Sequence, residues 1–96
     1  MNVKQDATRT SSAEPDVDAP LSDDEFERGY GAMLARRARA ATGLSEEEYA
    51  ECFGIPIVTL HAWEAGKEAP GDPATSYLRV IVQMPEAVAR ALHDAA

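Results

Sequence analysis

Residues 44–70, LSEEEYAECFGIPIVTLHAWEAGKEAP, decide the fold of this chain, because they contain two short helix patterns separated by a glycine. Ser45 is a preferred residue at a helix N-cap, and Glu48 stands three positions later, where its side chain can complete a capping box. Gly54 is suited to end a helix, because glycine adopts the left-handed conformation at low cost. The first half of the stretch therefore predicts a helix over residues 45–53.

The second half of the stretch predicts another helix over residues 56–65, which Gly66 ends. At about 100° per residue, Leu60, Trp63 and Thr59 fall on one side of this helix, which we expect to face the core. The opposite side is small and uncharged, and it consists of Ile57, Val58, His61, Ala62 and Ala65. Such a face can enter a DNA major groove, which is about 12 Å wide.

Similar signals indicate three further helices. An alanine- and arginine-rich helix over residues 32–42 precedes the quoted stretch and ends at Gly43. Asp72 as N-cap and Pro73 in the first turn begin a fourth helix, and Pro85 begins the last one. The inward apolar side chains of these last two helices are expected to be Leu78, Ile81, Val82, Val88 and Leu92. No segment alternates apolar and polar residues over a useful length, so the expected fold is all-α, with five helices.

Charge is distributed unevenly along the chain, whose formal net charge is −8 over 96 residues. Residues 1–27 hold two basic and eight acidic side chains, whereas residues 28–96 hold seven basic and nine acidic ones. The negative total argues against nucleic acid as a partner, but the nearly neutral second part removes most of this objection. Residues 1–20 are rich in Ser, Thr, Asp, Glu and Pro, so we expect a disordered acidic arm there.

Order is expected to begin at LSDDEF, residues 21–26, where Ser22 can cap a helix with the same chemistry as the quoted stretch. Gly29 and Gly31 follow, and each costs about 1 kcal/mol relative to alanine inside a helix. The segment 21–31 is therefore either a separate, marginal helix or the first part of the next helix, joined to it by a weak point.

Several other classes of function are not indicated. The chain has no apolar run long enough to cross a bilayer and no signal-peptide core, so we expect a cytoplasmic protein without membrane contact. Cys52, the single cysteine, and His61 have no partners at metal-ligand spacing. No nucleophile with a positioned base and no phosphate-binding glycine loop is present, so we expect neither an enzyme nor a cofactor or metal site. The small size of the chain favours a homodimer.

The quoted stretch resembles the helix-turn-helix of the Cro/repressor-like (XRE) family. Together with YLRVIVQMPEAVARAL, residues 77–92, it is similar to HigA-type antitoxins, and the resemblance covers residues 32–94. The positions that carry it are Ala50, Gly54, Leu60, Trp63, Glu64, Gly66 and Pro70. The resemblance implies a lambda-repressor-like DNA-binding domain over residues 32–96, with residues 45–53 as positioning helix and residues 56–65 as recognition helix.

The resemblance also implies roles for individual residues. Those expected to contact an inverted-repeat operator in double-stranded DNA are Ser45, Pro56, Ile57, Val58, Thr59, His61, Ala62, Lys67, Arg36 and Arg37. The two arginines either anchor phosphates or pair with the acidic cluster that follows Ser45. Arg39 and Glu64 match a structural ion pair between the first helix and the third. Glu46 stands where many members of the family have a glutamine that contacts a phosphate, and its carboxylate would repel the DNA backbone.

The segment EPDVDAPLSDDEF, residues 14–26, is similar to the arm through which related antitoxins engage an RNase toxin of the RelE (HigB) type. The residues expected to bind such a basic toxin are Leu21, Asp23, Asp24, Phe26, Glu27 and Tyr30. Alternatively, Phe26 and Tyr30 pack back on the domain itself. The leading hypothesis is a dimeric repressor that is also an antitoxin. Two alternatives are a protein-interaction module that no longer binds DNA and a plain regulator without a toxin.

Overall fold

The computed structural model describes residues 21–95, without the side chain of Ala95. Its helices are α1 (Asp23–Thr42), α2 (Glu46–Phe53), α3 (Ile57–Glu64), α4 (Asp72–Gln83) and α5 (Pro85–Ala95). No strand occurs within the described residues, so the prediction of an all-α fold with five helices is confirmed for this part of the chain. The acidic arm expected over residues 1–20 lies outside the described residues.

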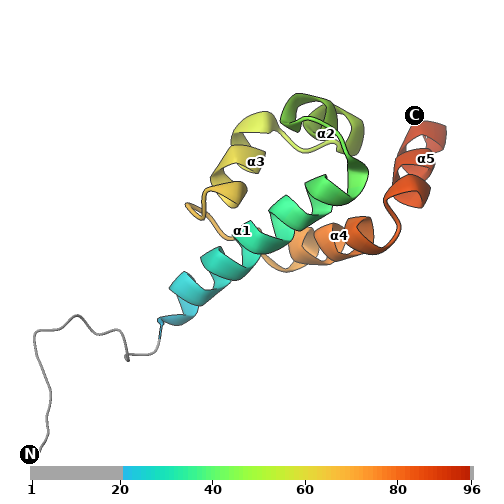
Figure 1. The fold of residues 1–96 in the computed structure, drawn as a ribbon. Coiled ribbons are helices and arrows are strands. Elements are labelled where there is room, and N and C mark those ends of the chain that lie inside the picture. Colours follow the sequence, from blue (N-terminus) through green and yellow to red (C-terminus); the bar gives the residue numbers. More distant parts are fainter. Residues whose placement is uncertain (1–20, 96) are drawn as a thin grey trace, which may run out of the picture.

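Helix α1 is the centre of the fold, because it contacts each of the other four helices. Figure 1 shows α2 and α3 on one side of α1 and α4 along the other, with α5 beside α2. The first turns of α1, drawn in blue, extend beyond the other helices. Within residues 21–95, none of the helices has the length and apolar character needed to cross a membrane.

Both predicted capping boxes are present. The Ser22 hydroxyl accepts a hydrogen bond from the Glu25 backbone N–H (3.1 Å), and the Ser22 N–H donates to the Glu25 carboxylate (3.0 Å). Ser45 and Glu48 form the same two bonds, 3.1 and 3.2 Å long. Gly54 ends α2 with a φ of 71°, in the left-handed region. Side-chain caps therefore set the starts of α1 and α2, and the left-handed backbone of a glycine sets the end of α2.

Two expectations for the last two helices are wrong. The N-cap of α4 is Gly71 rather than Asp72, and no side chain caps this end. Gly71 has a φ of 84°, which glycine adopts readily, so the chain turns one residue earlier and Asp72 falls in the first turn. Leu92 on α5 is 38% exposed rather than inward, whereas Val88 packs against the core as expected. Helix α5 lies at the edge of the molecule, where its last turn has few neighbours (Figure 1).

Helix α1 is continuous over 20 residues, so the boundary predicted between residues 31 and 32 is not a break in the structure. Gly29 and Gly31 both lie inside this helix. Gly31 is buried, and a Cβ at this position would lie 2.3 Å from Cδ of Pro70, whereas a Cβ at Gly29 would meet nothing within 4 Å. The loop before α4 therefore packs directly on the α1 backbone at Gly31, and tertiary packing outweighs the low helix propensity of glycine.

The core lies where α1, α2, α3 and α4 meet. Its buried residues are Leu34, Ala35, Ala38, Tyr49, Ala50, Phe53, Ile55, Leu60, Trp63, Leu78 and Ile81. Ala35 and Ala38 are fully buried, and their small side chains let the other helices approach α1 closely. Leu60 and Trp63 confirm the predicted inward side of α3. Burial raises the pKa of the Tyr49 phenol, whose oxygen has no hydrogen-bond partner among the described residues, so this side chain remains uncharged.

Candidate nucleic-acid interface

Helix α3 carries most of the residues expected to contact DNA, and a three-residue turn over residues 54–56 joins it to α2. Val58 is 76% exposed, and His61 is also exposed. Pro56 is the N-cap of α3 and faces solvent, whereas Thr59 and Ala62 are half-buried. The structure therefore presents a short outward face centred on Val58 and His61.

Ile57 does not belong to this outward face, so its predicted position there is wrong. Its side chain is half-buried and packs against the core. Ile55, two positions earlier, is buried in the core, and the turn from α2 places Ile57 beside it at the edge of the core. Apolar residues lie on every side of α3, and for this reason the sequence pattern alone did not define the two faces sharply.

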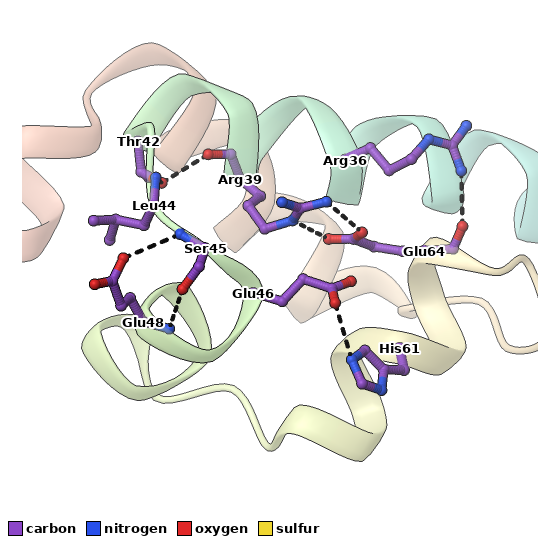
Figure 2. A network of polar contacts seen from close by, with 9 residues as sticks. All are labelled: Arg36, Arg39, Thr42, Leu44, Ser45, Glu46, Glu48, His61 and Glu64. Carbon is purple, nitrogen blue, oxygen red and sulfur yellow. Dashed lines mark hydrogen bonds and ion pairs between the residues drawn. The ribbon is translucent and has the colours of Figure 1, made fainter.

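Two arginines of α1 hold the C-terminal end of α3 (Figure 2). Arg39 donates from Nε and Nη2 to the two carboxylate oxygens of Glu64, at 2.9 and 3.0 Å, which confirms the predicted ion pair. The Glu64 hydrogen bonds are the main cause of a raised Arg39 pKa. Arg36 Nη1 donates to the backbone carbonyl oxygen of Glu64, at 2.7 Å. Such carbonyls at a helix end lack partners within the helix, so both arginines act to fix the position of α3.

The contact that Arg36 makes in the structure is neither of its two predicted roles. In the structure its guanidinium binds a backbone carbonyl rather than the acidic cluster at the start of α2. Arg37, the neighbouring arginine, is exposed. Arg36 and Lys67 are exposed as well, but the Arg36 guanidinium donates to the Glu64 carbonyl, so Arg37 and Lys67 are the better candidates for phosphate contacts.

A contact between Glu46 and His61 joins the first turn of α2 to the outward face of α3. The Glu46 Oε1 atom lies 3.2 Å from Nε2 of His61 (Figure 2). Sequence reasoning considered each residue separately, Glu46 as a repelling charge and His61 as a DNA-facing side chain. It missed that they meet, because they are 15 positions apart and their contact depends on how α2 and α3 cross.

The first turn of α2 presents strong negative charge beside this face. Glu46, Glu47 and Glu48 occupy it in succession, and they interact favourably with the positive end of the helix dipole. Ser45, a predicted phosphate contact, uses its hydroxyl in the capping box with Glu48. A DNA phosphate that approaches this helix end would therefore meet carboxylates as well as backbone N–H groups.

The residues expected to bind a toxin divide into two groups. Tyr30 packs against the core, and its hydroxyl accepts hydrogen bonds from Nε and Nη2 of Arg79 on α4, at 3.1 and 2.9 Å. Phe26 stacks on Tyr30, with ring centroids 6.3 Å apart, but is itself 60% exposed, and Leu21 is 64% exposed. The alternative of packing on the domain therefore holds for Tyr30 and not for Phe26. The acidic members Asp23, Asp24 and Glu27 are exposed, and Asp24 pairs with Arg28 one turn along α1.

The part of the chain that the structure describes contains no group of three or more His, Cys, Asp or Glu side chains placed to hold a metal ion. Comparisons with protein-family models, with curated proteins and with solved structures found no match to this chain.

Proposed function

We propose that this chain is a DNA-binding repressor in which α2 and α3 form a helix-turn-helix and α3 is the recognition helix. The observation that carries the proposal is the outward face of α3, with Val58 and His61 exposed, on a helix that Arg36 and Arg39 fix to α1. An α-helix fits the major groove, which is about 12 Å wide, and a rigidly held helix can place its side chains against base edges.

The side chains of this face favour apolar base contacts. The methyl groups of Val58 and Ala62 match the methyl group of thymine, which lies in the major groove. Lys67 and Arg37 are exposed and supply charge for phosphates. A homodimer would place two copies of α3 about 34 Å apart, so the proposed target is an inverted repeat in double-stranded DNA.

The Glu46→Gln variant is expected to bind DNA about fivefold more tightly than the unchanged protein. It removes a negative charge from the helix end that a phosphate would approach, and one unit charge close to another in water is worth about 1 kcal/mol. The measurement is a fluorescence anisotropy titration with a labelled duplex that contains the DNA directly upstream of the coding sequence. The affinity of both proteins should fall steeply as salt is added, because phosphate contacts release counterions.

The matched control is Glu51→Gln, which removes the same charge from an exposed position at the opposite end of α2. Its affinity should stay close to that of the unchanged protein. If Glu51→Gln tightens binding as much as Glu46→Gln, the effect comes from net charge, and α2 does not approach the DNA backbone. If no variant binds the duplex even at low salt, the repressor proposal is wrong.

A second candidate function is a protein-interaction module that keeps these helices without binding DNA. The observation that favours it is the run of Glu46, Glu47 and Glu48 in the first turn of α2, which opposes a phosphate there. Absence of DNA binding in the titration, together with retention of a protein partner, would establish this function in place of the first.

We further propose that the chain is an antitoxin that binds a basic RNase toxin through the start of α1. Leu21 and Phe26 expose apolar surface there, and Asp23, Asp24 and Glu27 surround it with negative charge. An RNA-cleaving protein needs a basic surface for its substrate, and carboxylates that cover such a surface would block it and speed the encounter. Tyr30 is left out of this proposed binding set, because it belongs to the packed domain.

Phe26→Ser should lower the affinity for the toxin at least about tenfold, because a buried aromatic anchor at an interface commonly contributes that much. The measurement is isothermal titration calorimetry with the small basic protein that the proposal places in the neighbouring reading frame, and absence of such a frame would contradict the antitoxin proposal. Leu92→Ser is the control, since Leu92 is also exposed but lies on α5 at the other end of the molecule. Equal affinities for Phe26→Ser and Leu92→Ser would contradict the proposed role of α1.

A further inference from the structure

The contact between the Glu46 carboxylate and His61 favours one of the two neutral tautomers of the His61 ring. Its Oε1 atom lies 3.2 Å from Nε2 of His61, and an ionised carboxylate can only accept a hydrogen bond. The neutral imidazole that satisfies this contact is protonated on Nε2 and leaves Nδ1 as an acceptor. In Figure 2 the second ring nitrogen lies on the side of the ring away from Glu46.

Helices α1 and α2 pack against α3, and both carry charged residues that can act on His61. Their charged residues are Asp23, Asp24, Glu25, Glu27, Arg28, Arg36, Arg37 and Arg39 on α1, and Glu46, Glu47, Glu48 and Glu51 on α2. Within the described residues, Glu46 is the member of this set that contacts His61. In the last turn of α3, which also holds His61, Arg39 pairs with the Glu64 carboxylate and Arg36 donates to the Glu64 backbone carbonyl. The charge of Arg39 also interacts with the Glu46 carboxylate.

We propose that His61 is a specificity-determining residue whose base contact changes with its protonation, and that Glu46 is its positioning residue. This inference rests on the proposed DNA-binding function. In the neutral form, Nδ1 can accept a hydrogen bond from the amino group of adenine or cytosine in the major groove. In the protonated form both ring nitrogens donate, so Nδ1 binds N7 or O6 of guanine or a phosphate oxygen instead.

Protonation of His61 also changes the electrostatics of the α2 helix end. The added proton comes from solvent, and the resulting imidazolium forms an ion pair with Glu46 at the contact already present. The carboxylate that opposes a phosphate at neutral pH is then neutralised by its partner. DNA affinity therefore rises as the pH falls, and the preference at the position opposite His61 shifts away from cytosine and toward guanine, whose N7 and O6 both accept hydrogen bonds.

The first test measures affinity for the labelled upstream duplex at about pH 8 and about pH 5.5, the range in which histidine ordinarily changes its charge. The unchanged protein should bind about fivefold more tightly at the lower pH, the size expected when one negative charge near a phosphate is neutralised. His61→Gln should lose most of this change. His93→Gln, which removes the other histidine of the chain, should keep it, because His93 lies on α5.

The second test examines the positioning role of Glu46 without DNA. Nitrogen NMR shifts of the His61 ring at about pH 8 report which nitrogen is protonated, and the unchanged protein should show the proton on Nε2. In Glu46→Gln the amide can donate as well as accept, so both tautomers should be populated. This variant should bind all duplexes more tightly but discriminate less between duplexes that differ at the base pair opposite His61.

The outcomes separate this inference from the proposed function. An acid response that persists in His61→Gln would overturn the inference while leaving the repressor proposal intact, and so would equal tautomer ratios with and without the Glu46 carboxylate. If no protein binds the duplex at either pH, the proposed function is wrong and the base-reading role of His61 is wrong with it.

Discussion

Arg39→Ala should lower the free energy of unfolding by about 2 to 3 kcal/mol, because it leaves the Glu64 carboxylate without its charged partner. The Glu64 side chain is only 9% exposed, so water cannot replace the two hydrogen bonds that Arg39 donates. The Arg39 side chain is 29% exposed, and solvent screens its charge. The loss of stability should therefore be smaller than for a fully buried ion pair. A urea titration monitored by circular dichroism measures the free energy of unfolding of both proteins.

Arg37→Ala is the matched control for this substitution. It removes the same side chain from the same helix at an exposed position, so its effect should stay within about 0.5 kcal/mol. Arg36→Ala would be a poorer control, because Arg36 also donates to the Glu64 backbone carbonyl. Equal losses in Arg39→Ala and Arg37→Ala would show that the Arg39–Glu64 pair contributes little and that other contacts fix α3 to α1.

The helix ends were predictable from the sequence because the interactions that set them are local. Ser22 and Ser45 reach a backbone N–H only three residues away, and Gly43 and Gly54 adopt the left-handed backbone that ends a helix. The same reasoning placed the start of α4 one residue late, because it weighed the side chain of Asp72 and not the backbone freedom of the glycine before it.

The candidate site was less predictable, because it depends on how helices cross. The pairing of Arg39 with Glu64 followed from the resemblance to a known family, and the structure contains it. The contact of Glu46 with His61 joins residues that the helical period assigns to two separate helices, and nothing in one sequence gives their mutual orientation. Ile57 was misplaced for a related reason, since the short, mostly apolar α3 has no polar stripe to mark its outer side.

The start of α1 shows how tertiary contacts alter a local expectation. Two glycines within three residues indicated a weak point, yet α1 continues through both. Tyr30, between them, is held by Arg79 of α4, and Gly31 is held against Pro70. The two residues of each contact are at least 39 positions apart in the chain, so no pattern within α1 could predict these contacts.

Gly31→Ala should destabilise the protein by about 2 kcal/mol, whereas Gly29→Ala should stabilise it by about 1 kcal/mol. Both substitutions add one methyl group to the same helix and improve its intrinsic propensity equally. They differ in what the new Cβ meets: at position 31 it would lie 2.3 Å from Cδ and 3.0 Å from Cγ of Pro70, and at position 29 it would meet nothing within 4 Å. A proline ring cannot rotate away as a flexible side chain can, so relief of the clash requires movement of the loop before α4.

The comparison of the two alanine variants isolates the packing contribution, because the helix-propensity gain is common to both. Thermal and urea unfolding of each variant, measured beside the unchanged protein, should therefore differ by about 3 kcal/mol. Replacing Pro70 by glycine in the Gly31→Ala background should recover part of the loss, since it removes the atoms that the new Cβ would meet. If Gly31→Ala instead stabilises the protein as Gly29→Ala does, the loop does not pack on α1 as described, and the continuity of α1 must have a different cause.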